Sequence, residues 1–149
     1  MEKACRVGLM RIIIDANILF AALIKESTTR KIFFHPMFEF FAPDFIFDEI
    51  NKNLKTVMEK TGMSEREIQT MLDLLKDNIF TFSFSFYKKN LREAKRIIGG
   101  YDKKDIPYIA LALSMGIEGI EGIWTNDRHF LKQKNIRVWK TKELLDLLK

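Results

Sequence analysis

The sequence predicts an α/β fold in which helices cover both faces of a central, mainly parallel sheet. Short apolar runs alternate with segments of helical periodicity along the whole chain, which is typical of successive βαβ units. The chain has 149 residues, of which 47% are hydrophobic, so it can build one domain with a substantial core but not two ordinary ones. We therefore expect a single-domain, three-layer α/β/α architecture.

The amino-terminal part of the chain predicts two strands joined by two helices. Ile12-Ile13-Ile14 is a continuous apolar run, as expected of a buried strand. The hydroxyl of Ser27 can cap the second helix. The expected elements are a strand at about 11–15, helices at about 17–25 and 28–35, and a short strand at about 38–41.

Proline, glycine and serine indicate the boundaries of a helical hairpin in the middle of the chain. Pro43 fits the first turn of a helix, where its missing N–H costs nothing, and Gly62 breaks that helix. Ser64 and Glu67 have the spacing of a capping box, in which each side chain binds the backbone N–H of the other residue. We therefore expect one helix over about 43–60 and a second that begins at Ser64.

The segment 79–86 has a strict period of two, which predicts a strand with one buried side. Phenylalanine alternates with threonine or serine, as in ordinary core patterning. The alternative is that exposed phenylalanines stack on nucleic-acid bases. The alternating phenylalanines are Phe80, Phe82, Phe84 and Phe86.

The remainder of the chain continues the alternation of helices and strands. Gly116 ends one of the expected helices, since glycine is common just after a helix, and Thr141 is expected to cap the last one. The expected elements are helices at about 90–98 and 105–115, strands at about 122–125 and 136–139, a short helix from Asp127 between those strands, and a final helix from Thr141.

Composition and charge narrow the class of protein. Cys5 is the only cysteine, which excludes an internal disulfide and a thiolate-rich zinc site and fits a reducing compartment. No apolar stretch approaches the ~20 residues of a membrane helix, and the first residues lack the apolar centre of a signal peptide. We therefore expect a cytoplasmic protein with no membrane partner. The formal net charge of +5 suits a phosphate polymer, with a lysine-rich soluble surface as the plain alternative.

The domain is expected to begin at residue 10. Met10-Arg11 directly precedes the first strand and can itself serve as a translation start. Residues 1–9 are therefore interpreted as an N-terminal extension of a domain over 10–149. The mass of the natively expressed protein would distinguish the two starts.

Two carboxylates follow predicted strands. Asp15 comes directly after Ile12-Ile13-Ile14, and Asp127 follows the strand that ends near Thr125. Open α/β sheets bind their ligands at the carboxyl ends of the strands. Carboxylates that converge there repel one another by several kcal/mol at ~4 Å, so they must take up protons or bind a cation, and Mg²⁺ or Mn²⁺ suits oxygen ligands. For Asp15, capping the following helix is the alternative role.

A third acid is expected on the helix after the second strand, where Asp48 and Glu49 compete. Neighbouring helical positions point about 100° apart. Asp48 shares its helix face with charged residues and is spaced four positions from Lys52, as in an ordinary surface ion pair. Glu49 instead borders the apolar line of Ile46 and Ile50, where a lone carboxylate would be costly without a partner. We therefore choose Glu49.

Asp102 and Asp105 compete for a fourth position, and Pro107 decides between them. Proline is tolerated only in the first turn of a helix, so this helix begins near Lys104 or Asp105. A carboxylate there meets the positive end of the helix dipole and stays ionised, as a metal ligand should; a plain N-cap is the alternative. Asp102 is assigned as an auxiliary acid, with an ordinary turn residue as the equal alternative.

Other polar side chains near these acids are candidates for auxiliary roles. Asn17 is assigned to this group. Thr125 and Asn126 offer a hydroxyl and an amide that can orient a carboxylate, a water or a phosphate oxygen, with loop solvation as the alternative. His35 and His129 have no second histidine at metal-ligand spacing, so we expect neither to bind a metal.

Four segments together resemble the PIN domain family, over nearly the whole chain from Met10. They are residues 10–19 around Asp15, Asp48-Glu49-Ile50, residues 102–113 around Asp105, and residues 124–130 around Asp127. The resemblance implies a Rossmann-like parallel sheet and a nuclease that uses Mg²⁺ or Mn²⁺ and acts on single-stranded or structured RNA. Many small prokaryotic members of the family are toxins of toxin–antitoxin pairs, and dimers are common in the family.

The sequence therefore predicts a divalent-metal-dependent endoribonuclease that binds one or two ions. The expected metal ligands and catalytic residues are Asp15, Glu49, Asp105 and Asp127. The expected contacts to the nucleic-acid backbone are Lys103, Lys104, Arg128 and residues of the stretch 25–31. The expected partners are RNA and, from the resemblance, an antitoxin protein and a second copy of the chain.

Two alternatives remain open. One is a nuclease-inactive PIN-fold module that binds RNA or another protein, against which the intact set of four acids argues. The other is a phosphatase that uses Asp15 as its nucleophile. Asn17 then occupies the position where that chemistry needs a second acid as proton donor.

Overall fold

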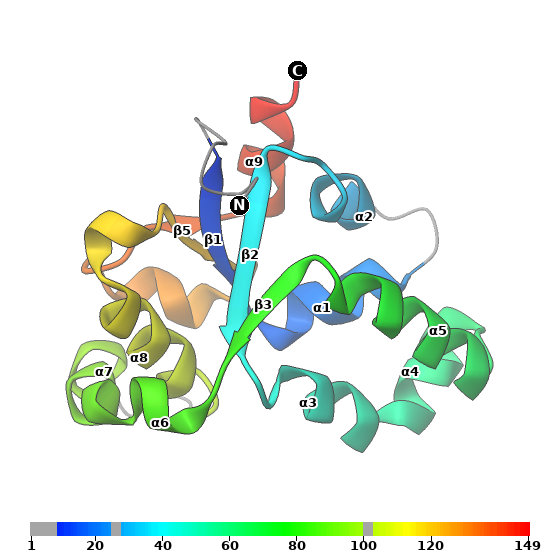
Figure 1. Cartoon of the computed structure of the whole chain (residues 1–149), viewed down its shortest axis with the longest axis horizontal. Helices are drawn as coiled ribbons and strands as arrows, with labels where there is room; N and C mark the ends of the chain where they lie inside the picture. Colours follow the sequence, from blue (N-terminus) through cyan, green and yellow to red (C-terminus); the bar gives the residue numbers. More distant parts are fainter. Residues whose placement is uncertain (1–8, 25–27, 100–102) are drawn as a thin grey trace.

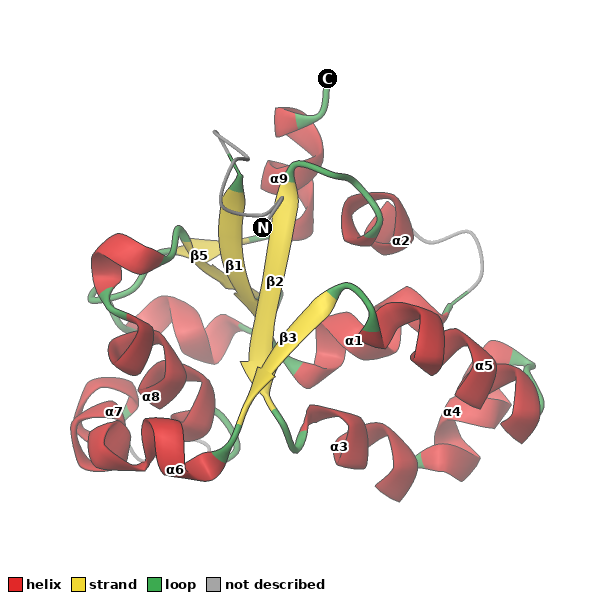
Figure 2. Cartoon of the chain, viewed as in Figure 1, coloured by secondary structure: helices red, strands yellow, loops and turns green. Residues whose placement is uncertain are grey.

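The structure is a computed structural model that describes residues 9–24, 28–99 and 103–149. Helices surround a central sheet (Figures 1 and 2). Several features predicted from the sequence lie outside the described residues. They are residues 1–8 of the N-terminal extension, the Ser27 cap, the beginning of the stretch 25–31, and Asp102.

The described residues form one five-stranded sheet in which every strand pair is parallel. The strands are β1 Met10–Ile14, β2 Phe38–Pro43, β3 Ile79–Phe82, β4 Gly122–Trp124 and β5 Val138–Trp139. Their order is β3-β2-β1-β4-β5, so the chain starts in the middle of the sheet and builds outwards first on one side and then on the other. The predicted α/β class and parallel sheet are confirmed.

Helices cover both faces of this sheet and complete the three predicted layers. The α-helices are α1 Ala16–Leu23, α2 Thr28–Phe33, α3 Ile46–Lys52, α4 Leu54–Thr61, α5 Glu65–Lys76, α6 Phe84–Tyr87, α7 Leu91–Ile98, α8 Ile106–Met115 and α9 Thr141–Leu147. Short 3-10 turns lie at η2 Lys88–Asn90, η3 Ile117–Gly119 and η4 Arg128–Lys132. In Figure 1, α6, α7 and α8 lie on one side of the sheet and α1, α2 and α5 on the other. No described helix has the length and apolar character needed to cross a bilayer.

The two central strands are held in place by complete burial of their side chains. Residues 12–14 of β1 have no exposed surface, although successive side chains point to opposite faces of the sheet. On one face, the rings of Phe33, Phe40 and Trp124 pack together with centroids 4.8 to 6.0 Å apart. Full burial of one such side chain contributes about 1.5–3 kcal/mol. The core therefore fixes the carboxyl ends of β1 and β4, the strands that precede two of the candidate acids.

The prediction of one helix over about 43–60 is wrong at its start and in its middle. Pro43 is the last residue of β2 and pairs with Phe82 of β3, and the helix begins only at Ile46. The end of β2 is buried between its neighbours, and burial of this apolar run outweighs the local preference of proline for a helical first turn. Asn53, with φ −112° and ψ 24°, then separates α3 from α4.

The Phe-rich strand is shorter than its period of two predicts. β3 ends at Phe82, which pairs with the last residue of β2, so no neighbouring strand is left to extend the ladder. The chain turns into α6 instead. Phe84 and Phe86 are consequently 56% and 37% exposed, and the prediction that they face the core is wrong.

Of two helix caps predicted from the sequence, one is confirmed and one is wrong. Ser64 and Glu67 form the predicted capping box at the start of α5. At the start of α9 the cap position is Lys140, and Thr141 is already the first helical residue. The hydroxyl of Thr141 instead accepts a hydrogen bond from Nε1 of the buried Trp124, at 3.0 Å. A tertiary contact therefore takes the place of the local cap.

Gly122 opens β4 in a conformation that other residues adopt poorly. Its φ is +140°, and a Cβ added there would lie 2.3 Å from the carbonyl oxygen of Arg137. We expect Gly122→Ala to lower the free energy of unfolding by about 2–4 kcal/mol, through overpacking and backbone strain. Gly119→Ala is the matched control, because a Cβ at Gly119 meets no atom within 4 Å. Denaturant titration measures both, and equal stability of the two variants would contradict the close approach.

Candidate active site

The four acids selected from the sequence line one cavity. The cavity has a volume of about 590 Å³ and lies where β1 and β4 end. The chain leaves β1 towards one side of the sheet and later returns to β4 on the other, and open α/β sheets bind ligands at such a point. Besides the four acids, the lining includes Asn17, Phe20, Phe45, Asn53, Lys104 and Tyr108.

Asp15 combines a helix cap with a place in the cavity wall. It is 4% exposed, and its Oδ1 accepts a hydrogen bond from the backbone N–H of Ile18 at 3.0 Å, which caps α1. Its Oδ2 accepts from the hydroxyl of Thr125 at 2.5 Å. Burial raises the pKa of the Asp15 carboxyl to about 6 in spite of these two hydrogen bonds, and the nearby charge of Asp127 raises it further. The sequence offers helix capping and a place in the site as alternative roles for Asp15, and in the structure this residue both caps α1 and lines the cavity.

Thr125 connects the acids at the ends of the two central strands. Its buried hydroxyl donates to Asp15 and accepts from the backbone N–H of Asp127 at 3.0 Å. One side chain therefore orients a carboxylate and the loop that carries another. Asn126 is exposed and is not among the cavity-lining residues, because its amide is hydrogen-bonded to Thr141 at the start of α9.

Asp105 and Glu49 reach the cavity from two helices. Asp105 is 6% exposed and stands at the N-cap position of α8, with Pro107 in the first turn. Its carboxylate meets the positive end of the helix dipole, which favours the charged form by about 0.3–1 kcal/mol. On α3, Glu49 is half-buried and lines the cavity, whereas the neighbouring Asp48 is exposed. The geometry thus separates the two acids between which the sequence analysis had to choose.

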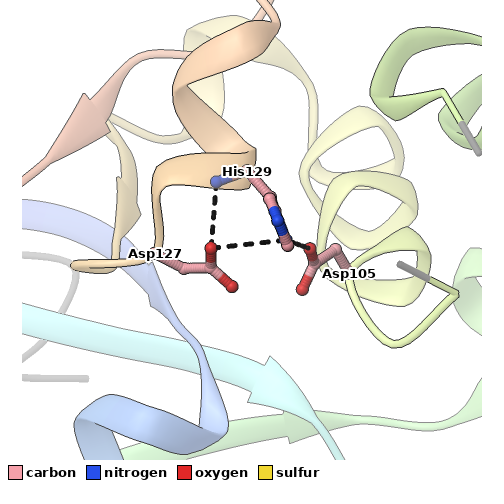
Figure 3. Close-up of side chains that lie close together, drawn as sticks. All are labelled: Asp105, Asp127 and His129. Atoms are coloured by element: carbon pink, nitrogen blue, oxygen red, sulfur yellow. Dashed lines mark hydrogen bonds and ion pairs between the residues drawn. The ribbon is translucent and has the colours of Figure 1, made fainter. Parts of the chain in front are cut away.

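His129 lies closer to two of the acids than the sequence suggests. Its Nδ1 is 3.8 Å from Asp105 Oδ2 and 3.5 Å from Asp127 Oδ1, and its backbone N–H donates to Asp127 Oδ1 at 2.9 Å (Figure 3). Among the described residues, these three side chains offer ligand atoms within 4.8 Å of one another. The sequence predicts no metal-binding role for His129, whereas the structure places it in a group of side chains that could hold a metal ion. The turn η4 brings it there.

Tyr108 is a second residue of the site that the sequence analysis missed. It lies on α8, one turn after Asp105, and it is 4% exposed. Its burial raises the pKa of the phenol, and the charges of Asp15, Glu49 and Asp105 add to this effect. The available signal was its spacing from Asp105, since residues three apart lie on one face of a helix.

The basic and amide side chains assigned from the sequence differ in their positions. Lys104 lines the cavity, as does the exposed Asn17. Lys103 and Arg128 are exposed, each directly beside a residue of the lining.

The burial and chemistry of the acids fit a divalent cation. The raised pKa of Asp15 shows that the site disfavours an unneutralised carboxylate, and a cation in the cavity would remove this penalty. Carboxylate oxygens are the donors that suit Mg²⁺ or Mn²⁺. Asp105 and Asp127, with His129 beside them, supply the closest ligand atoms, and Asp15 and Glu49 line the same space.

The family model described as PIN domain matches residues 13–149, a range that includes all four acids. No curated protein matches the chain.

The contribution of Asp15 to the stability of the metal-free protein is expected to depend on pH. Because its pKa is raised from 3.8 to about 6, the folded state binds this proton more tightly than the unfolded chain does. The contribution is full below about pH 3.8 and is lost as the pH rises through about 6, and a shift of this size corresponds to roughly 3 kcal/mol.

We therefore expect the unfolding free energy of the wild type, minus that of Asp15→Asn, to fall by up to roughly 3 kcal/mol between about pH 4 and about pH 7. Urea titrations in the presence of a chelator measure this difference, and the asparagine variant removes the titrating group. A difference that does not change with pH would show that Asp15 keeps an ordinary pKa.

Proposed function

The chain belongs to the PIN domain family, a family of nuclease domains, and from this premise we propose that it is a divalent-metal-dependent endoribonuclease. One observation carries the proposal. Asp15, Glu49, Asp105 and Asp127 are far apart in the sequence, yet all four line a single cavity at the ends of β1 and β4. Clustered acids of this kind suit phosphodiester hydrolysis assisted by a metal ion.

The residues of the site have separable roles in this proposal. The four acids would hold one or two ions, and Mg²⁺ or Mn²⁺ bound there would lower the pKa of an attacking water and neutralise charge on the phosphate. Thr125 keeps the Asp15 carboxylate in one orientation and ties the Asp127 loop to it. His129 stands beside Asp105 and Asp127, where it can adjust their charge and position.

The cavity and its surroundings also support a nucleic-acid substrate. A volume of about 590 Å³ is large enough for a nucleotide beside the acids. The rings of Phe20 and Phe45 supply apolar wall, and Lys104 supplies a positive charge. Lys103 and Arg128 are proposed to contact the phosphate backbone outside the cavity. The choice of RNA over DNA, and an antitoxin or a second copy of the chain as partner, are predictions that rest on the family resemblance.

Two neighbouring acids on α3 test the assignment of the cavity. Glu49 lines it, whereas Asp48 is exposed. We expect Glu49→Gln to reduce cleavage of a labelled single-stranded RNA in Mn²⁺ by roughly a hundredfold or more, since even an outer-sphere partner of a metal is worth about 10–100-fold. Asp48→Asn should stay within about twofold of the wild type. Equal activity of both variants would refute the role of Glu49.

Calorimetry with Mn²⁺ tests metal binding independently of cleavage. We expect Asp105→Asn to bind Mn²⁺ at least about tenfold more weakly than the wild type, because it removes a charged ligand from the tightest cluster. Asp48→Asn again serves as the control, and circular dichroism checks that both variants are folded. Undiminished Mn²⁺ affinity in Asp105→Asn would contradict the site, and absence of Mn²⁺ binding in the wild type would favour a nuclease-inactive module.

A further inference from the structure

We propose that Tyr108 is a positioning residue of the metal site, whose hydroxyl donates a hydrogen bond to the carboxylates that bind the cation. The inference rests on the metal-binding part of the proposed function and adds a neutral donor to the acidic cluster. It stands on the place of the phenol in the cavity wall, on the burial of its hydroxyl, and on the groups that face it.

The ring of Tyr108 is held in a defined position. It is 4% exposed and packs edge-on against Phe45, with ring centroids 5.7 Å apart, and against Phe130, at 6.4 Å. The two rings come from different elements, Phe45 directly before α3 and Phe130 in η4. A side chain packed in this way has little freedom to turn, so its hydroxyl keeps one position.

The hydroxyl of Tyr108 is buried and has no hydrogen-bond acceptor among the described residues. Such a donor is costly, because the hydrogen bond that it would give to water is lost and not replaced. A phenylalanine would fill the same space without that cost. A tyrosine at this position is therefore best explained by an acceptor that comes within reach in another state of the site.

The groups that face the hydroxyl identify this acceptor. The charges of Asp15, Glu49 and Asp105 act on the phenol, and with its burial they raise its pKa, against a smaller opposing effect of the Ala16 N–H. A phenol is protonated near neutral pH in any case, so toward a carboxylate it can act only as a donor. The hydroxyl oxygen is covered by protein atoms. A substrate phosphate could reach this oxygen only by displacing those atoms. The proposed acceptors are therefore the nearby carboxylates, which would shift toward the hydroxyl when they bind a cation.

Hydrogen bonds from an outer layer orient metal ligands and are worth about tenfold to a hundredfold in metal affinity. Thr125 already has this role for one oxygen of Asp15. Tyr108 would be its counterpart from α8, so that the acids are held from two sides of the cavity. The hydroxyl of Tyr108 would find a hydrogen-bond acceptor only when a cation is bound in the site.

The variant Tyr108→Phe removes this hydroxyl and keeps the ring. We expect Mn²⁺ affinity, measured by calorimetry, to fall about tenfold to a hundredfold. The metal-free variant should unfold at the same or a higher temperature than the wild type, because the hydroxyl donates no hydrogen bond there. Cleavage should be impaired at low Mn²⁺ and largely restored at saturating Mn²⁺.

Tyr87→Phe is the matched control. Tyr87 is as buried as Tyr108 but faces Asp44 and is not part of the cavity lining. Its variant should bind Mn²⁺ like the wild type.

Three results would overturn the proposal. They are unchanged Mn²⁺ affinity in Tyr108→Phe, a lower unfolding temperature of that variant without metal, or an activity loss that persists at saturating Mn²⁺, which would assign the hydroxyl to the substrate. The first two readouts need no RNA. If the wild type binds Mn²⁺ but cleaves no RNA, the proposed nuclease activity is contradicted. The role of Tyr108 is then still tested by the Mn²⁺ affinity and the unfolding temperature of its variant.

Discussion

The candidate site depends on holding several negative charges in a small and largely buried space. Asp15 shows how far the protein offsets this cost. Two hydrogen bonds and the N-terminus of α1 favour its charged form, yet burial still raises its pKa to about 6. The shift from 3.8 to about 6 corresponds to roughly 3 kcal/mol, and this is the cost that remains after the favourable contacts have acted. A cation bound beside Asp15 would offset it.

The parallel sheet is what brings these charges together. Because the chain begins in the centre of the sheet and later returns to the other side of β1, the loops after β1 and β4 leave side by side. Asp15 and Asp127 come from these loops, and α3 and α8 add Glu49 and Asp105. Residues 12–14 and Trp124 are completely buried, so the strand ends that carry the site are among the best-fixed parts of the described chain.

Two groups near the acids have no role assigned from the sequence. His129 brings an imidazole to the Asp105 side of the cluster, and Tyr108 brings a phenol to the interior. They lie in η4 and in the first turn of α8, and each of these elements directly follows one of the acids. The site is therefore better described as a mixed polar cluster around four acids than as an isolated carboxylate set.

The sequence by itself determined the α/β class, the parallel sheet, most element positions and the four acids that line the cavity, because these follow from local periodicity, helix signals and the residues that come after strands. The choice of Glu49 over Asp48 also came from local geometry, through the faces of one helix. Only the tertiary structure decided where β2 and β3 stop. The last residue of a strand depends on the strand that pairs with it, and here Pro43 and Phe82 form the final pair. The tertiary structure alone placed His129 and Tyr108 at the site. It also showed that the Thr141 hydroxyl accepts a hydrogen bond from Trp124 and does not cap α9. Contacts of this kind join residues far apart in the chain, and no local pattern records which distant side chains will meet once the elements pack.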